Sequence, residues 1–461
     1  MSTIPSPIIR TALALAMLPA GLIALRAADD SDAEIKALRE QIRLLDQRLH
    51  QLEQKQQIKE QEAAAAAKTA PKIAISDKGF TFASGDGANS IRIGGLVQLD
   101  SRLFFGDGGG VYNNSFVLRR ARVISEGTLG KIYSFQIIPE LGGSTVSILD
   151  ANVVVAPSSR LQFKLGRFKA PVGLELLQSD SATFFVERSL VSNLVPNRDL
   201  GVQVGGSFTD GAFAYAVGIF NGVADATSTS NVDFDNDKDV VARVFAQPFK
   251  NNKGSSLQGL GVGVAASLGR EKGPAAVTAG YKTDGQQTFF KYNSTVVADG
   301  RIWRVSPQAY YYSGPFGALG EYVVSTVNAR PSATGAKTAL QNKAWQLVAG
   351  FVLTGEDASF TSVVPQQPFS WDDGTWGAWQ IVARYSNLRL DGNIFPLFAS
   401  PAINASEASS AGIGLNWYLS KTVRTSLDYF QTRFNNPVPV SSTQILRQDE
   451  QALITRFQLS F

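Results

Sequence analysis

The feature that most constrains the fold of this chain is an alternation of apolar and polar residues, sustained from Ile91 to Phe461. Successive side chains of a β-strand point to opposite faces, so this alternation assigns every second residue to one face. In the last segment, "QALITRFQLSF", leucine and phenylalanine share one face with Thr455, while Arg456 and Ser460 lie on the other. The pattern predicts an all-β fold with one apolar face throughout.

Sixteen segments carry this alternation, and most of them are ten or more residues long. Strands of soluble sheets usually have about five or six residues, whereas a tilted strand needs about 9–11 to cross a bilayer. The predicted strands cover residues 91–105, 115–130, 131–140, 145–156, 160–168, 199–209, 212–220, 238–249, 257–269, 300–313, 316–329, 339–354, 375–390, 410–419, 422–434 and 450–461.

The connections between these segments are of two kinds. Turns such as 157–159 are tight, whereas residues 169–198, 221–237, 270–299 and 391–409 form long, polar loops. Short turns at one end, long loops at the other and an even strand number describe a bacterial outer-membrane barrel. A soluble β-sandwich explains the alternation but not the strand lengths or the loops. We therefore predict a sixteen-stranded antiparallel transmembrane β-barrel over residues 91–461, with an aqueous lumen.

The composition agrees with many strands joined by turns: the chain has 42 Gly and 10% aromatic residues. It has no Cys, and its one histidine, His50, lies in a helical segment near the N-terminus. A His-based triad, a His-ligated zinc site and a haem site are therefore disfavoured, and an enzyme would need a Lys- or carboxylate-based scheme. We expect no enzyme activity, cofactor or metal. The net charge of +4 is too small to indicate an anionic partner by itself.

The N-terminal segments differ in kind from the barrel. Residues 1–27 have the layout of a secretory signal peptide, with Arg10 before a run of about 15 apolar residues and small residues at the end. An uncleaved anchor is the alternative. The stretch "AAAAAKTAPK" indicates a helical tail that ends before Pro71, and we predict a linker over residues 68–90.

Residues 28–67 carry a heptad pattern, with isoleucine at a and leucine at d in the first two heptads. The seam consists of Ile35, Leu38, Ile42, Leu45, Leu49 and Leu52. We predict a short periplasmic coiled coil, and a single amphipathic helix lying on a domain is the alternative. Isoleucine at a with leucine at d favours dimers, so this rule does not support a trimer.

The run from Arg160 to Lys169 places cations within an apolar strand. Lys or Arg on the lipid face costs about 2–4 kcal/mol at mid-bilayer, so Leu161 and Phe163 should face lipid and Lys164 the lumen. The same parity directs further charges inward: Arg92, Arg102, Arg120, Arg122, Arg243, Arg384, Arg424 and Arg456, with Asp100, Asp150 and Asp428. We expect water in the lumen to solvate Arg160, Gln162 and Lys164. A ring of Lys and Arg side chains in a pore favours the passage of anions, whereas a ring of mixed charges only tunes a general pore. The alternative to a selective ring is ordinary pairing of charges along the barrel wall.

The loop over 169–198 has about thirty residues without strand periodicity, which is unusual unless the loop has a function. It is too apolar for a freely solvated tip. We predict that it folds inward and narrows the lumen; an external loop used for trimer contacts or surface binding is the alternative.

Several segments together resemble one family of outer-membrane channels. They are "FVLRRARV", "GRFKAPVGLELLQS", "FFVERSLV", "PNRDLGVQVGG" and the terminal aromatic of "FQLSF". As a set, over roughly residues 79–461, they are similar to the phosphate/polyphosphate-selective porin family (porin O/P type). The resemblance implies a sixteen-stranded trimeric pore, in which an inward-folded third loop and nearby arginines form an anion-binding constriction.

The resemblance also carries over site residues. Arg119 and Arg120 match the strand arginines of the family, and Arg188 matches its loop arginine. Asp150 looks like its lumen aspartate, and Ser179 lies where a loop hydroxyl is expected. Together with the basic run, the candidate anion-binding residues are Arg119, Arg120, Arg188, Lys164, Lys169, Ser179 and Asp150.

One departure from the family pattern bears on phosphate. Phosphate-specific members carry a lysine directly after "GLE", where this chain has Leu176, and Asp180 adds an acid nearby. The loss of a cation weakens the prediction of phosphate specificity.

We therefore predict an outer-membrane porin for passive diffusion of small anions, including phosphate or polyphosphate, with its N-terminal segment in the periplasm of a Gram-negative-type bacterium. The expected partners are small inorganic anions, outer-membrane lipid and further copies in a homotrimer, with cell-wall contact through the coiled coil and no nucleic acid. The alternatives are a general or sugar-type nutrient porin, or an envelope-tethering barrel with an incidental pore.

Overall fold

The structure is a computed structural model that describes residues 30–106, 112–229, 233–274, 277, 280–439 and 446–461. Residues 30–33 and 63–69 are described by their backbone. The chain divides after Thr69 into two units, which are described in turn. The predicted signal peptide over 1–27 lies outside the described residues.

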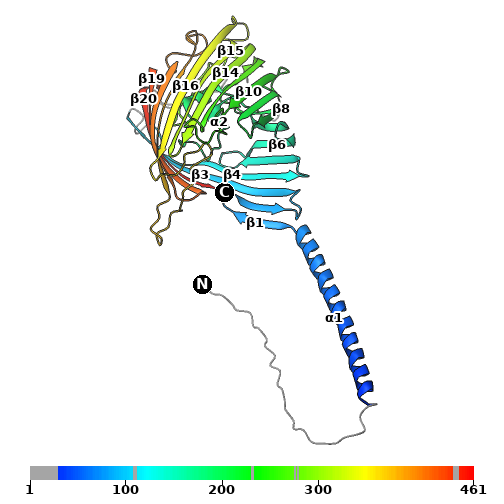
Figure 1. Cartoon of the computed structure of the whole chain (residues 1–461). Helices are drawn as coiled ribbons and strands as arrows, with labels where there is room; N and C mark the ends of the chain where they lie inside the picture. Colours follow the sequence, from blue (N-terminus) through cyan, green and yellow to red (C-terminus); the bar gives the residue numbers. More distant parts are fainter. Residues whose placement is uncertain (1–29, 107–111, 230–232, 275–276, 278–279, 440–445) are drawn as a thin grey trace. The chain divides into compact units, whose positions relative to one another are not determined.

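The first unit contains one continuous helix, α1 (Asp30–Thr69), at the predicted place (Figure 1). It ends two residues before Pro71, because the residue that precedes a proline disfavours the helical conformation. The six seam residues named above are 49–64% exposed in the single chain, so the coiled coil stays a prediction. Among the described residues, no helix is both long enough and apolar enough to cross a membrane.

The second unit is an antiparallel barrel. Of the eighteen strands in its main sheet, β1 and β2 form a hairpin at the margin, and the other sixteen close the barrel. The wall strands are β3 Ser90–Phe105, β4 Ser115–Leu129, β5 Tyr133–Glu140, β6 Ser147–Ser158, β7 Leu161–Lys169, β8 Arg198–Phe208, β9 Phe213–Phe220, β10 Asp239–Ala246, β11 Leu260–Gly273, β14 Val297–Ser313, β15 Phe316–Arg330, β16 Thr338–Val352, β17 Ala378–Arg389, β18 Glu407–Tyr418, β19 Val423–Pro439 and β20 Leu446–Ser460. All sixteen predicted strands are confirmed.

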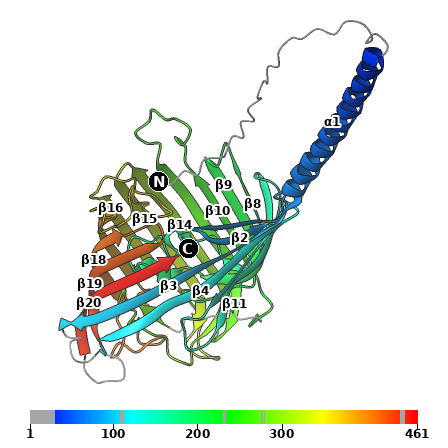
Figure 2. The same cartoon turned by 90° about the horizontal axis from the view of Figure 1, so that it is seen from below.

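The barrel closes where β20 pairs with β3, from Gln451 opposite Phe105 to Ser460 opposite Leu96 (Figure 2). Beyond this pairing, Phe461 and Gly95 exchange backbone hydrogen bonds of 3.0 and 2.8 Å. Closure gives the paired backbone groups of β3 and β20 the hydrogen-bond partners that hydrocarbon could not supply.

The predicted linker over 68–90 needs a correction, because it contains a β-hairpin made of β1 (Lys72–Ser76) and β2 (Gly79–Ala83). The first residues of β3 extend past the end of β20, and β2 pairs with them, Phe80 opposite Ile93. Gly79 permits this approach: its φ is +98°, and a Cβ there would lie 2.3 Å from the carbonyl oxygen of Ile93.

The wall alternates between an exposed outer face and an inner face, as predicted. In β7, Leu161, Phe163 and Leu165 are 37–43% exposed, whereas Lys164 is half-buried on the inner side. The predicted inward charges are also on the inner face. Arg160 and Gln162, which were predicted to be solvated, are exposed. Most of the other inward arginines are instead surrounded by protein groups, because Arg102, Arg120, Arg384, Arg424 and Arg456 are at most 7% exposed.

The connections define two ends of the barrel. We call the end with the β4–β5 and β6–β7 turns the turn end, and the opposite one the loop end. One connection departs from the predicted pattern, because residues 353–377 form a long segment at the turn end. Its Phe360 packs against Tyr310 on the inner wall, with ring centroids 5.2 Å apart.

The apolar core lies inside the barrel and is made largely by loops. The loop over 170–197 buries Leu194, the loop segment over 280–296 buries Phe290, and the loop over 390–406 buries Phe398 in one cluster. The second of these loops carries the short strands β12 (Tyr281–Lys282) and β13 (Thr288–Phe290). Its Asp284 pairs with the wall arginine Arg384 at 2.5 Å, so a segment predicted only as a long polar loop packs inside the barrel.

Candidate functional site

The loop between β7 and β8 is folded into the barrel, as predicted. It contains α2 (Leu174–Leu177) and the 3-10 helix η2 (Leu190–Leu194), and α2 lies inside the ring of strands (Figure 1). Its apolar residues account for this position, since Val172, Leu174 and Phe185 are at most 1% exposed. Burying them removes from water the apolar surface that an external loop would expose.

Arginines of the wall bind the polar groups that this loop carries into the interior. Arg384 donates to the carbonyl of Glu187 at 2.9 Å and to the carboxylate of Glu175 at 3.3 Å. Arg456 donates to Asp100 at 2.6 and 2.8 Å and lies 3.3 Å from Oε1 of Glu187. A buried backbone or carboxylate oxygen without a partner is costly, so these contacts fix the loop across the lumen.

Arg119 and Arg120 are adjacent in β4, yet both contact inward groups. Neighbouring side chains of a regular strand point to opposite faces. The register explains the exception: Gln98 is opposite Arg120 and Leu99 is opposite Leu118, so Arg119 is the extra residue of a β-bulge. Arg119 donates to the Glu187 carboxylate at 2.6 and 3.0 Å.

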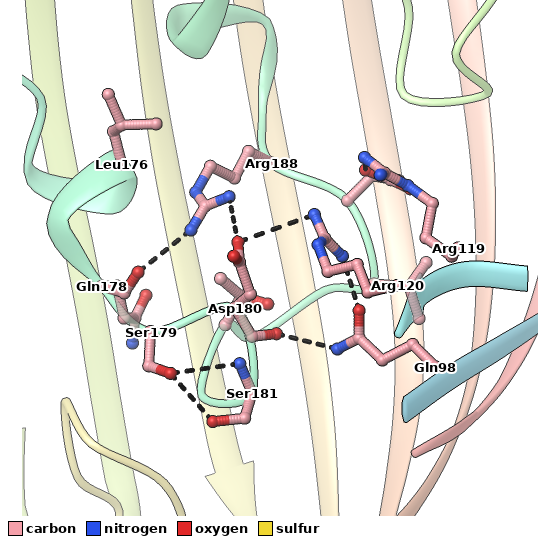
Figure 3. Close-up of polar contacts among 12 residues, drawn as sticks. Gln98, Arg119, Arg120, Leu176, Gln178, Ser179, Asp180, Ser181 and Arg188 are labelled. Carbon is pink, nitrogen blue, oxygen red and sulfur yellow. Dashed lines mark hydrogen bonds and ion pairs between the residues drawn. The ribbon is translucent and has the colours of Figure 1, made fainter. Parts of the chain in front are cut away.

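Three arginines converge on one loop carboxylate, Asp180. Figure 3 shows two of them, Arg120 and Arg188. Nη1 of Arg188 lies 2.5 Å and Nη2 of Arg120 lies 3.6 Å from its Oδ1, and Arg122 pairs with its Oδ2. Burial would raise the pKa of this carboxyl, but Arg120, Arg188, Lys169 and Arg122 hold the pKa well below its usual value. Asp180 is therefore an anion within a group of cations.

The carbonyls at the end of α2 receive two further cationic side chains. Lys169 donates from Nζ to the carbonyls of Leu176 and Gln178 at 2.7 and 2.9 Å. Arg188 donates to the carbonyls of Glu175 and Gln178 at 3.1 and 3.0 Å. Neutral oxygens orient these donors without cancelling their charge.

Two cavities lie on either side of this cluster. The loop-side cavity has a volume of about 350 Å³ and is lined by Arg119, Arg120, Arg188, Leu176, Glu187 and Lys282, among others. The turn-side cavity has a volume of about 870 Å³ and is lined by Lys164, Lys169, Ser179, Asp180, Asp150 and Arg122, among others. Cations predominate in both linings, so this arrangement can attract and bind an anion electrostatically.

All seven candidate residues of the sequence thus line one of the two cavities. Ser179 lies 2.9 Å from the hydroxyl of Ser181 (Figure 3). Asp150 accepts from Arg198 at 3.0 Å, and Lys164 lies over the ring of Phe168, 4.5 Å from its centroid. None of this tests whether these residues bind an anion, so their role stays a proposal.

Some lining residues were not among the candidates. Arg122 was predicted to face the lumen and Arg198 belongs to the "NRDLG" segment, so both had a signal in the sequence. Lys282 had no such signal, because nothing in the sequence indicates that residues 280–296 enter the barrel. Asp180 was noted as a departure, but its central place in the cluster depends on long-range contacts.

No catalytic pair is apparent in these contacts. Among the described residues, no three His, Asp or Glu side chains are grouped so as to hold a metal ion.

Comparison with known proteins gives one family and several similar folds. The family model of phosphate-selective porins O and P matches residues 91–461. Porin O of Pseudomonas aeruginosa is 24% identical over 397 residues, which cover 78% of this chain and 85% of that protein.

Among solved structures, the outer membrane channel DcaP of Acinetobacter baumannii aligns with a TM-score of 0.52 at 10% identity, covering 82% of this chain and 98% of that chain. OmpT of Vibrio cholerae, expressed in the outer membrane, aligns with a TM-score of 0.51 at 10% identity, covering 81% and 98%. At such low identity these two structures support the barrel fold alone.

Proposed function

Because this chain belongs to the phosphate-selective porin O and P family of outer-membrane channels, we propose that it is a porin for passive diffusion of small anions, with phosphate or polyphosphate as substrates. Anions would pass between the inward loop and the wall strands β3 to β8. Arg119, Arg120, Arg188 and Lys169 would attract them.

One observation carries the proposal: the cluster of Arg120, Arg122 and Arg188 lies between two cavities in whose linings cations outnumber acids. A narrow, low-dielectric passage lined by one sign of charge concentrates counter-ions and speeds their entry. Guanidinium groups also match the geometry of phosphate oxygens.

The test is single-channel conductance in a planar bilayer, with the reversal potential measured under a KCl gradient and phosphate titrated in. We expect preference for chloride over potassium, and block of the chloride current by phosphate. Arg188→Gln should weaken this block about tenfold, since one charge-assisted contact worth ~1.4 kcal/mol is lost.

Arg243→Gln is the matched control, because Arg243 is an inner-face arginine of β10 that donates to Gln308 at 2.9 Å and lines neither cavity. It should keep the wild-type block. Cation preference, or a large conductance that phosphate leaves unchanged, would contradict the proposal.

A general or sugar-type nutrient pore is the second candidate. It is favoured by the apolar Leu176 in the loop-side cavity and by the charge of Asp180 within the arginine cluster. Such a pore would conduct with weak ion preference, which the same measurement separates from the first candidate.

Assembly is a further proposal. The family resemblance supports a homotrimer, and the exposed apolar seam of α1 supports association of this helix with copies of itself. A periplasmic coiled coil would extend toward the cell wall. The protein would then have a second role besides the pore, which is to tether the outer membrane to the cell wall.

A further inference from the structure

Asp180 occupies the place in the arginine cluster that an oxyanion would take. Asp180 is 5% exposed. Its carboxylate pairs with Arg188 and Arg120 (Figure 3) and also with Arg122. The contacts at Oδ1 are ion pairs at 2.5 and 3.6 Å, and this oxygen accepts no well-aligned hydrogen bond among the described residues. Charge, rather than hydrogen-bond geometry, therefore holds Asp180 against Arg120 and Arg188.

The backbone around Asp180 is fixed from the wall. Gln98 of β3 donates to the carbonyl of Asp180 at 3.0 Å, and Gln458 of β20 donates to the carbonyl of Ser181 at 3.1 Å. The amide of Ser181 also donates to the hydroxyl of Ser179 at 3.3 Å. These contacts keep the carboxylate in the cluster as a permanent part of the barrel.

The cluster retains capacity for a second anion. Nε of Arg120 is buried and has no hydrogen-bond partner within the described part of the chain. Lys169 and two nitrogens of Arg188 donate to neutral carbonyls. Glu140 is a second acid at the edge of the cluster, where it pairs with Arg122 at 2.7 Å.

We propose that Asp180 is a built-in counter-anion of the arginine cluster, which competes with the permeating oxyanion and sets how strongly that anion binds. The proposal rests on the proposed function and names the residue that tunes it. A fixed carboxylate lowers the attraction that the cations exert, so anions bind weakly and leave quickly. Conduction requires this balance, because binding must be strong enough for entry and weak enough for release.

The experiment uses the full chain in planar bilayers, with inorganic phosphate as the probe. Asp180→Asn keeps the shape of the side chain and removes its charge. We expect the phosphate concentration that halves the chloride current to fall about tenfold, the effect of one opposite charge removed from a partly desolvated site. The preference for chloride over potassium should rise in the same variant.

Two variants serve as controls. Asp180→Glu retains the charge and should keep a block close to that of the wild type. Asp299→Asn removes an equal charge from β14, where Asp299 lies 2.5 Å from Arg330 and lines neither cavity. It should leave the block unchanged. Asp180→Ser replaces Asp180→Asn if asparagine prevents folding, and folding is checked by the heat-dependent migration of the barrel on a denaturing gel.

The outcomes separate the two proposals. If phosphate blocks the wild type and Asp180→Asn equally, the counter-anion role is overturned while the anion pore stands. Block that appears only after Asp180 is neutralised supports the counter-anion role and corrects the wild type to a general pore. Insensitivity of both proteins to phosphate overturns both proposals. Failure of both uncharged variants to form a barrel assigns Asp180 a structural role and overturns this inference.

Discussion

Single residues decide which charges reach the interior. Arg119 contacts Glu187 and Arg120 contacts Gln98 from the same strand, because the bulge at Arg119 changes the direction of one side chain. A regular strand would have directed one of these arginines toward lipid, at a cost of about 2–4 kcal/mol. The bulge, which adds one residue to β4, thus brings a second cation to the loop-side cavity.

Leu176 gives a prediction at this scale. Its side chain is 5% exposed and lines the loop-side cavity. A lysine there can keep its stem in the apolar surroundings and extend its ammonium into the cavity. We expect Leu176→Lys to strengthen phosphate block a few-fold, consistent with ~1 kcal/mol from one partly solvated charge.

Leu176→Met is the matched control, because it nearly conserves volume and adds no charge. Both variants are compared by phosphate titration of the single-channel current. An unchanged block in Leu176→Lys would mean that permeating anions do not approach this cavity wall.

At the scale of elements, the inward loop depends on the wall for its position. It has only α2 and η2 as regular structure, and its carbonyls and carboxylates are bound by arginines of β3, β4, β17, β19 and β20. The apolar residues in the sequence of this loop were enough to indicate that the loop is buried. The partners lie up to 270 positions away in the chain, so local patterns could not name them.

Arg456 tests this dependence. Its side chain is fully buried and binds Asp100 and the loop residue Glu187. Replacing it by glutamine leaves both carboxylates without that cation, which costs roughly 3–5 kcal/mol for a buried charge pair. We expect Arg456→Gln to loosen the loop and give a larger, noisier single-channel current, with the barrel still formed.

The control for this variant is Arg433→Gln, which changes an exposed arginine on the neighbouring strand β19. Its current should match that of the wild type. A quiet channel of wild-type conductance in Arg456→Gln would show that the remaining contacts hold the loop without Arg456.

At the scale of the whole molecule, the chain combines a closed barrel with a helix whose apolar seam residues are exposed to solvent in the single chain. Leu45 and Leu49 of the seam are 64 and 55% exposed. Such a stripe is stabilised when a second helix covers it, and the heptad spacing suits that arrangement. The barrel, in contrast, has its own hydrogen-bonded closure between β3 and β20.

The double variant Leu45→Gln, Leu49→Gln tests the seam. Glutamine is a good helix former, so helix content should stay the same while the apolar contact is lost. We expect a lower or concentration-dependent oligomer mass by light scattering in detergent, with unchanged unitary conductance. Changing Arg43 and Gln47, which lie off the seam, to alanine is the control. An oligomer mass equal to that of the wild type would show that the seam is not an interface.

The amino-acid sequence was sufficient to predict the barrel, its sixteen strands, the helix before it and the inward loop between β7 and β8. These follow from local patterns, because strand alternation, heptad spacing and loop hydrophobicity are each written in neighbouring residues. Three other features were apparent only in the tertiary structure: the hairpin of β1 and β2, the entry of residues 280–296 into the lumen, and the convergence of three arginines on Asp180. Each depends on contacts between residues far apart in the chain, which become neighbours only when the barrel closes.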